Sequence, residues 1–292
     1  MAAFEDLPEE CIADILSRTT PLDAGRFSII SKTFHSAADS DALWNQFLPF
    51  DPNFIDSVIA HSRSLANIPT KKDLYLALSD RPIIIENGKK SFQLDRKSGK
   101  KCFMLAARSL AISWGDDLRY WNWIVMPDSR FPEVAKLCYV WWLEIRGMIN
   151  TLALSPNTQY GAYLVFKMID PRGFENLPVD LTVGVEGDNS STKVVCLEPH
   201  VEPHPFVHNR ARSLRRYRHL GGLPNRVAGL QRPSVRSDGW LEIEMGEFFN
   251  SDVEHEEVHM SVMETKAGEV KGNFFVEGIE IRPKEEKLNI VQ

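Results

Sequence analysis

The sequence predicts an α+β multidomain protein, in which an amino-terminal three-helix module precedes an antiparallel, jelly-roll-like β-sandwich. Helix signals fill roughly the first 80 residues. After Lys101, apolar and polar residues alternate with period two in many short segments, and turn residues lie between these segments. No long helical segment separates them, which favours antiparallel pairing in a sandwich over a parallel sheet.

The overall composition excludes several classes of function. The 292 residues carry a net charge of -6 and are 43% hydrophobic, as in an ordinary folded protein. This charge gives no field that would attract nucleic acid or an anionic membrane, so we expect neither as a partner. The first ten residues lack a basic, apolar leader, and the four cysteines form no CxxC pair. We therefore expect an intracellular protein in a reducing compartment.

The first predicted helix follows Pro8. In the run after it, Ile12, Ile15 and Leu16 recur at positions i, i+3 and i+4, which places them on one apolar helix face. Three short helices of this kind bury too little surface to be stable alone. We therefore expect the module to lean on another structure.

Two further segments complete the module, which we assign to residues 1–48. Thr20 is a suitable cap for the second helix, with Pro21 at its first position. The third segment is interrupted at Ser40, continues through Trp44 and ends before Pro49.

Residues 49–100 are predicted to be a helical connector. Asp51 and Pro52 mark the start of one helix, and Thr70 caps another. The composition turns to glycine and lysine between Glu86 and Lys101, so we place the domain boundary there.

The sandwich is predicted to span residues 101–284, with a tail at 285–292. Its clearest strand is VDLTVGVEG, where valine and leucine face one way and polar residues the other. The segments with similar alternation are WWLEIRGMI, YGAYLVFKMI, GWLEIEMGEF, EVHMSVMET and NFFVEGIEI. The stretch from Pro199 to Pro233 is rich in Pro, His and Arg and is expected to be a surface loop.

The amino-terminal strings LPEECIADIL, TPLD, SKTFHSAA and LWNQFLP resemble the F-box family. This resemblance implies docking onto the Skp-family adaptor of a cullin-RING (SCF) ubiquitin ligase, with the rest of the chain choosing the substrate. An uncovered apolar stripe with aromatic and aliphatic anchors suits such an interface. The alternative is that the helices only cap the sandwich. The positions that match the family are Leu7, Pro8, Ile12, Ile15, Leu16, Pro21, Leu22, Ser31, Lys32 and Trp44.

From about residue 100 to Lys284, the chain resembles the phloem protein two or Nictaba-like lectin domain of plants. The matching strings are WWLEIRGMI, LSPNTQYGAYLVFK, DGWLEIEMGEFF and VEGIEIRP. The resemblance implies a sandwich that binds carbohydrate, namely glycans or glycoproteins that contain N-acetylglucosamine. It also implies a receptor subunit in the nucleus and cytoplasm, with no catalytic residues, cofactor or metal of its own.

A sugar presents an apolar face of C–H groups and a rim of hydroxyls, so its site needs an exposed aromatic ring beside polar groups. The segment SWGDDLRYWNWIVMP is the best candidate, since its Trp121 and Trp123 share one face of a strand. The open alternative is that both are core residues of that strand. The candidate sugar contacts are Trp114, Trp121, Trp123, Asp116 and Asn122, whereas Trp141, Trp142 and Trp240 are assigned to the core or the sheet surface.

Other motifs are weaker signals. The string HEEVH, His255 to His259, matches the HExxH zinc-protease pattern, but its flank alternates as a strand does. On a strand the two histidines would lie about 13 Å apart and could not share a metal. The three histidines within residues 200–208 and the basic run at 210–220 are expected to lie in a solvated loop.

Two rival functions stay open. One is an F-box adaptor whose sandwich binds a protein surface without sugar affinity, through the arginine-rich loop. The poorer one is a lectin-like hydrolase, which would need two carboxylates flanking a cleft.

Overall fold

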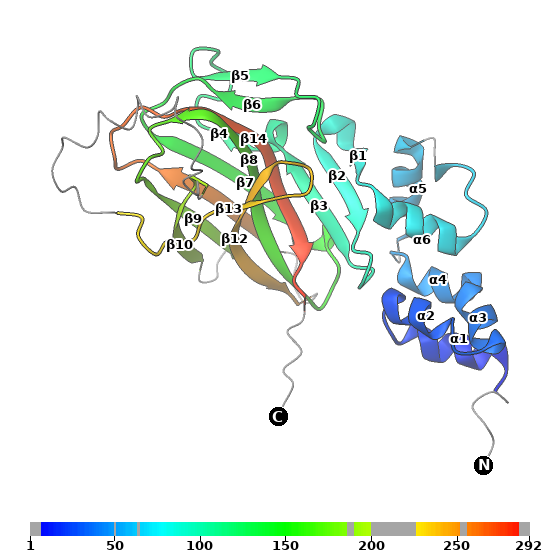
Figure 1. Ribbon diagram of the computed structural model, residues 1–292. Helices are drawn as coiled ribbons and strands as arrows, with labels where there is room; N and C mark the ends of the chain where they lie inside the picture. The colour runs from blue at the N-terminus through cyan, green and yellow to red at the C-terminus, as the bar shows by residue number, and fades with distance from the viewer. Residues whose placement is uncertain are drawn as a thin grey trace, which may run out of the picture.

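The computed structural model describes residues 7–49, 51–62, 65–185, 190–199, 226–251 and 256–285. It shows a helical arm beside a β-sandwich (Figure 1). The predicted fold class, helices followed by an antiparallel sheet domain, is confirmed. In the described ranges, no helix is both long and apolar enough to span a membrane.

Residues 7–49 contain four helices, where the sequence predicted three. Ser40 explains the difference, because its extended backbone ends one helix while its hydroxyl oxygen accepts the Leu43 N–H and begins the next. Thr20 caps the second helix as predicted, through the Asp23 N–H. The helices are α1 (Glu9–Ser17), α2 (Pro21–Phe27), α3 (Lys32–Asp39) and α4 (Asp41–Phe47).

The connector is helical only as far as Asp80. Beyond it the chain forms strands that join the larger sheet, so the segment Glu86–Lys101, where we placed the domain boundary, is mostly sheet structure. Asn87, Gly88 and Gly99 adopt positive φ at its reversals, and the Gly–Lys composition that suggested the boundary marks these tight turns. The elements are α5 (Pro52–His61), α6 (Lys71–Asp80), β1 (Ile83–Ile85), η3 (Glu86–Gly88) and β2 (Lys90–Leu94).

Two antiparallel sheets form the sandwich within the described ranges. The larger runs β1-β2-β3-β14-β8-β12-β11, with β6 also on β14 and β5 on β6, and the smaller runs β10-β9-β13-β7-β4. The strands are β3 (Lys101–Ala106), β4 (Ala111–Ile112), β5 (Trp121–Ile124), β6 (Val134–Leu137), β7 (Leu143–Asn150), β8 (Thr158–Arg172), β9 (Pro178–Val185), β10 (Ser191–Cys196), β11 (Ser234–Val235), β12 (Leu241–Asn250), β13 (Glu257–Glu264) and β14 (Gly272–Pro283). Short 3-10 turns lie at η4 (Ala107–Ser109) and η5 (Thr151–Ala153).

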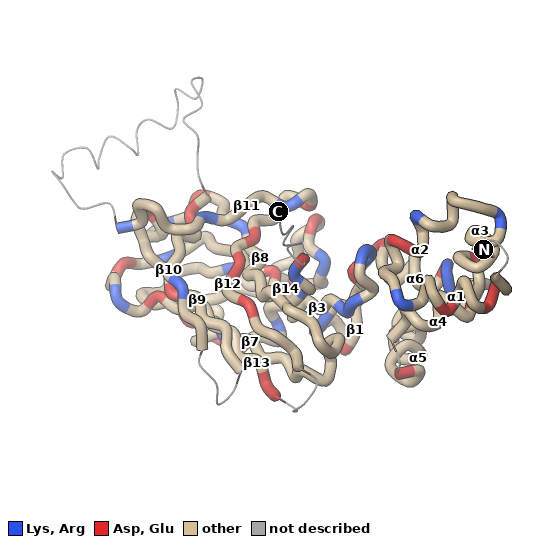
Figure 2. The backbone as a smooth tube through the Cα atoms, turned by 90° about the horizontal axis from the view of Figure 1, so that it is seen from below, with Lys and Arg blue, Asp and Glu red and all other residues tan. Residues whose placement is uncertain are grey.

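The arm and the sandwich meet through packed side chains and hydrogen bonds. Trp44 of α4 packs against Tyr75 of α6, with ring centres 5.1 Å apart. The Tyr75 hydroxyl lies 3.1 Å from the Asp95 carbonyl oxygen and 3.2 Å from that of Arg96, in the turn between β2 and β3. The arm extends from the β1 end of the sandwich in both views (Figures 1 and 2). One apolar core therefore runs from the helices into the sheets.

Candidate functional site

Five aromatic side chains line the loops that precede β5 and β7, and we call them the aromatic arc. Neighbouring rings in the arc have centres 4.8, 5.5, 5.3 and 5.7 Å apart. Three indoles are strongly exposed, at 42%, 45% and 53%. Rings gathered at the surface in this way mark a binding site more often than a fold requirement. In order along the arc, the residues are Trp142, Trp114, Tyr120, Tyr139 and Trp141.

The loop that carries Trp114 is wound by tight turns. Trp114 itself has φ +58°, a left-handed conformation that a bulky residue adopts only at some cost in strain. The Asp117 N–H donates to the Trp114 carbonyl at 3.0 Å, and the Tyr120 N–H donates to that of Asp117 at 2.9 Å. The Cys138 N–H then donates to the Tyr120 carbonyl at 2.8 Å, which joins this loop to the strand end that leads to Tyr139.

Trp121 and Trp123 support the loop of Trp114 through hydrogen bonds from their indole N–H groups. Trp121 is only 1% exposed, and its indole N–H donates to the Ser113 carbonyl at 3.2 Å. The Trp123 indole N–H donates to the Gly115 carbonyl at 3.0 Å, so the two bonds hold the chain on either side of Trp114. The prediction that Trp121 offers a ring face to a sugar is therefore corrected, because that ring lies in the core. Trp123 is half-buried, and the Arg108 guanidinium covers its ring at 3.7 Å from the centre.

Polar groups border the arc. Asp116 is exposed beside Trp114, whereas Asn122 is half-buried on β5. Arg119 lies 5.4 Å from the Tyr120 ring centre and pairs with Asp117, with Nη2 and Oδ2 2.6 Å apart. The hydrogen bonds from Arg119 hold the pKa of the Asp117 carboxyl below its usual range. A carboxylate and a guanidinium that can form hydrogen bonds thus lie at the edge of the arc.

Sequence reasoning missed four members of the arc as site residues. Trp141 and Trp142 were assigned to the core or the sheet surface, and they are exposed, while Trp240 is fully buried. Tyr120 and Tyr139 were not predicted as site residues. The WW pair at 141–142 was the available signal, because two adjacent indoles on a chain in extended conformation cannot both point inward.

The ten predicted adaptor contacts divide between surface and interior. Ile15 and Leu22 are exposed apolar side chains, Pro8 and Lys32 are exposed, and Leu7 and Ser31 are half-buried. The remaining four are buried within the arm and cannot meet a partner directly; they are Ile12, Leu16, Pro21 and Trp44.

These four buried residues instead hold the arm together. The indole N–H of Trp44 donates to the Ala38 carbonyl at 2.6 Å. Pro21 abuts Gly99, where an added Cβ would lie 3.3 Å from the proline Cγ. Their placement as direct contacts is therefore corrected to support of the helices that carry the exposed residues.

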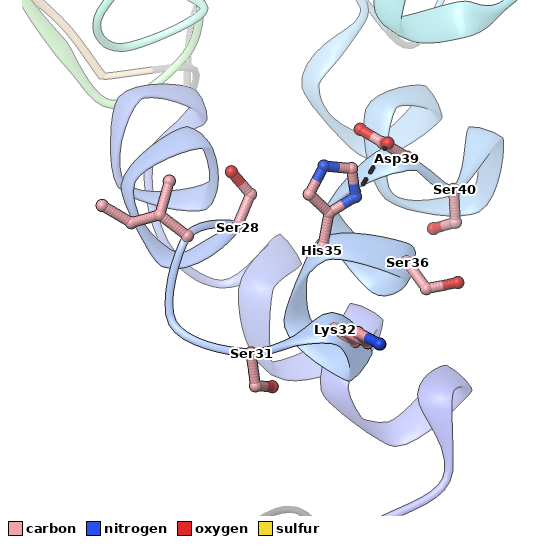
Figure 3. A pocket seen from close by; sticks show the side chains of 8 residues that line it. Ser28, Ser31, Lys32, His35, Ser36, Asp39 and Ser40 are labelled. Atoms are coloured by element: carbon pink, nitrogen blue, oxygen red, sulfur yellow. Dashed lines mark ion pairs between the residues drawn. The ribbon is translucent and has the colours of Figure 1, made fainter.

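The turn between α2 and α3 presents apolar surface. Ile29 is 86% exposed and Ile30 61%, with Phe27 nearby on α2. Ile29 also borders an open depression of about 690 Å³ along α3 (Figure 3). In this depression His35 Nδ1 lies 3.2 Å from Asp39 Oδ2. The exposed apolar turn and this polar hollow form one continuous face of the arm.

Comparison with known proteins covers both parts of the chain. The F-box domain model matches residues 4–46, and the model of phloem protein 2 matches residues 100–283. The F-box protein PP2-B10 of Arabidopsis thaliana is 42% identical over 96% of this chain and 94% of its own length. F-box protein PP2-B15 of the same plant is 40% identical over 97% and 98%. The chain belongs to the phloem protein 2 family of F-box proteins. This domain pair supports a role as a substrate adaptor of an SCF ubiquitin ligase.

Solved structures resemble this F-box protein only weakly. A carbohydrate-binding module, TmCBM61 in complex with β-1,4-galactotriose, is 12% identical with a TM-score of 0.31, over 61% of this chain and 91% of its own. A Podospora anserina GH26-CBM35 mannanase is 7% identical with a TM-score of 0.32, over 63% and 28%. At these scores neither likeness supports an inference about the F-box protein.

Within the described ranges, no three His, Cys, Asp or Glu side chains group as they would around a metal ion. His259 lies on β13, where the alternating pattern predicted a strand. Its HEEVH partner His255 and the segments 200–208 and 210–220 lie outside the described residues.

Proposed function

We propose that this F-box protein docks a Skp-family adaptor through its helical arm and binds glycans that contain N-acetylglucosamine through the aromatic arc. The aromatic arc carries the glycan half of the proposal. Its exposed indoles offer apolar faces for the C–H groups of a sugar, and neighbouring rings touch, with centres about 5 to 6 Å apart, so that they form one extended apolar surface. The chain would select a substrate and perform no chemistry, in the nucleus and cytoplasm.

A glycan array tests the sugar half. The full-length protein is compared with Trp114→Ala and Trp142→Ala, each of which removes an exposed ring. We expect each variant to bind N-acetylglucosamine oligomers about tenfold more weakly, which corresponds to about 1.4 kcal/mol. Phe249→Ala is the matched control, because Phe249 is an exposed aromatic residue of β12 outside the arc. Equal binding by all three variants and the wild type would remove the arc from the site.

A pull-down with a purified Skp-family adaptor tests the other half. The arm exposes four apolar side chains that such a partner could cover, namely Ile29, Ile30, Ile15 and Leu22. We expect Ile29→Asp to abolish capture, since it places a charge at the most exposed of these four side chains. Val235→Asp on β11 is the control, because Val235 is exposed on the sandwich. Undiminished capture of Ile29→Asp contradicts this docking surface.

The rival, a sandwich that binds protein without sugar, makes a different prediction. Free N-acetylglucosamine oligomers should displace a captured glycoprotein substrate if the arc binds its glycan. Capture of the substrate that is insensitive to free sugar would favour the rival. We also expect no turnover of chito-oligosaccharides by the protein.

A further inference from the structure

A buried ammonium group contacts the loop before β7, which carries Trp141 and Trp142, the two end members of the arc. Lys271 is fully buried, and its Nζ donates to the Trp141 carbonyl at 2.7 Å and to the Glu269 carbonyl at 3.1 Å. The same Nζ forms an ion pair with the buried Glu264. The backbones of Lys271 and Val140 also exchange hydrogen bonds of 2.7 and 3.0 Å. Lys271 thus holds the chain at two successive residues, Val140 and Trp141.

Glu264 in turn organises the connection between β13 and β14. Its Oε1 accepts the N–H groups of Lys266 and Ala267, at 2.9 and 2.8 Å. Burial alone would raise the pKa of the Glu264 carboxyl, but the Lys271 ammonium and these N–H groups hold it below its usual range. The pair connects the turn after β13 to the loop before β7.

Burying an ion pair is expensive, and replacing such a pair by apolar residues of similar volume is often neutral or stabilising. Stability alone is therefore a weak reason for a lysine here. Lys271 supplies a hydrogen-bond donor to the Trp141 carbonyl, which an apolar side chain could not supply. The other loop of the arc has an equivalent support in the indole N–H bonds of Trp121 and Trp123.

We propose that Lys271, held by Glu264, is a positioning residue that fixes Trp141 and Trp142 in the arc for ligand binding. Its own side chain touches no ligand, because it is covered. This proposal rests on the proposed glycan-binding function, but its effect on the rings can be measured separately. Trp142 and Trp114, with centres 4.8 Å apart at 37°, should give an exciton couplet in the far-ultraviolet circular dichroism spectrum.

The test uses full-length Lys271→Met/Glu264→Gln. This variant removes both charges and keeps an acceptor for the turn at Lys266. We expect it to fold with near-normal thermal stability, to lose at least half of the indole couplet, and to bind N-acetylglucosamine oligomers about tenfold more weakly, or about 1.4 kcal/mol. Lys193→Met/Glu244→Gln is the matched control, because that ion pair of 3.3 Å joins β10 to β12 outside the arc. It should leave couplet and affinity unchanged.

The outcomes separate the two proposals. A folded double variant with a normal couplet, or with a reduced couplet and normal affinity, overturns the positioning role and leaves glycan binding standing. If the wild type binds no glycan, the proposed function fails, while loss of the couplet still assigns Lys271 to ring placement. Should the double variant not fold, Lys271→Leu/Glu264→Gln, which also leaves no unpaired buried charge and keeps the acceptor at Glu264, replaces it with the same measurements and the same readings.

Discussion

The helical arm and the sandwich both expose large apolar side chains, but they hold them in opposite ways. In the arm, Ile29 and Ile30 lie in a short turn between two helices of seven and eight residues, and both side chains are largely exposed. In the sandwich, bonds from Trp121, Trp123 and Lys271 to backbone carbonyls fix the loops of the aromatic arc.

This contrast indicates which kind of partner each surface suits. An aliphatic turn on short helices fits a protein partner that supplies the missing contacts over a large area. A braced set of rings fits a small ligand, because rings already in place lose little conformational freedom on binding.

Trp44→Ala should damage the arm and spare the arc. Trp44 packs on Phe47 and Tyr75, with ring centres 5.6 and 5.1 Å away, and it is almost fully buried. Its loss should cost about 3 to 5 kcal/mol of stability, by cavity formation. Hydrogen exchange should show α1–α4 opening, and adaptor capture should fall while glycan affinity holds. An equal loss of glycan affinity would show that the two regions do not act separately.

Acid should damage the sandwich before the arm. Burial alone would raise the pKa of Glu280, but Arg130, Arg236 and Arg282 hold it below its usual 4.5. Because this pKa is lower in the folded state, its stabilising effect is complete above the unfolded value and is lost as the pH falls through the folded one. Glu242, Glu244 and Glu264 behave alike, whereas burial raises the pKa of Glu277, which opposes them.

We therefore expect the sandwich to lose about 1 to 3 kcal/mol as the pH falls below about 4.5. Near-ultraviolet circular dichroism of the arc and far-ultraviolet signals of the helices can be followed in the same acid titration. Arg236→Met should move the sandwich transition to higher pH and leave the helical one in place. A helical transition that comes first would contradict the assignment.

Tyr75→Phe should loosen the joint between the two regions. The Tyr75 hydroxyl reaches the Asp95 and Arg96 carbonyls, and burial raises its pKa beyond the usual range, so it stays a neutral donor. Loss of the hydroxyl should cost about 1 kcal/mol. Adaptor and glycan affinities should each persist, and exchange at the β2–β3 turn should rise. Ser57→Ala on α5, an exposed hydroxyl bonded within its own helix, is the control.

The sequence predicted what short patterns determine. The Thr20 and Thr70 caps and the alternating strands from Leu143 to Pro283 lie within single segments, and the structure confirms them. Helix periodicity also found the stripe of Ile12, Ile15 and Leu16. It could not tell which of these residues the other helices cover, since coverage depends on how α3 and α4 pack.

The arc was only partly predictable for the same reason. Trp114 was chosen correctly as an exposed ring, but its partner Trp142 lies far along the chain. The two rings meet because β4 pairs with β7, and the Ser113 N–H donates to the Glu144 carbonyl at 3.0 Å. Likewise, Trp121 and Trp123 alternate on a strand as expected, yet Trp121 is buried and Trp123 half-buried because the loop of Ser113 and Gly115 packs over them. No local pattern in the sequence records either contact.

Arg108→Ala should have the smallest effect and bears on whether Trp123 belongs to the binding surface. Arg108 lies over the Trp123 ring and pairs with Glu133 at 2.8 Å, both partly exposed. Its removal should cost about 0.5 to 1 kcal/mol of stability, the usual value of an exposed cation–π contact. Because Trp123 braces the arc through its indole N–H and not through its covered face, glycan affinity should stay unchanged. Stronger glycan binding by Arg108→Ala would show instead that the uncovered Trp123 ring adds a plate to the arc, and that the arginine normally blocks it.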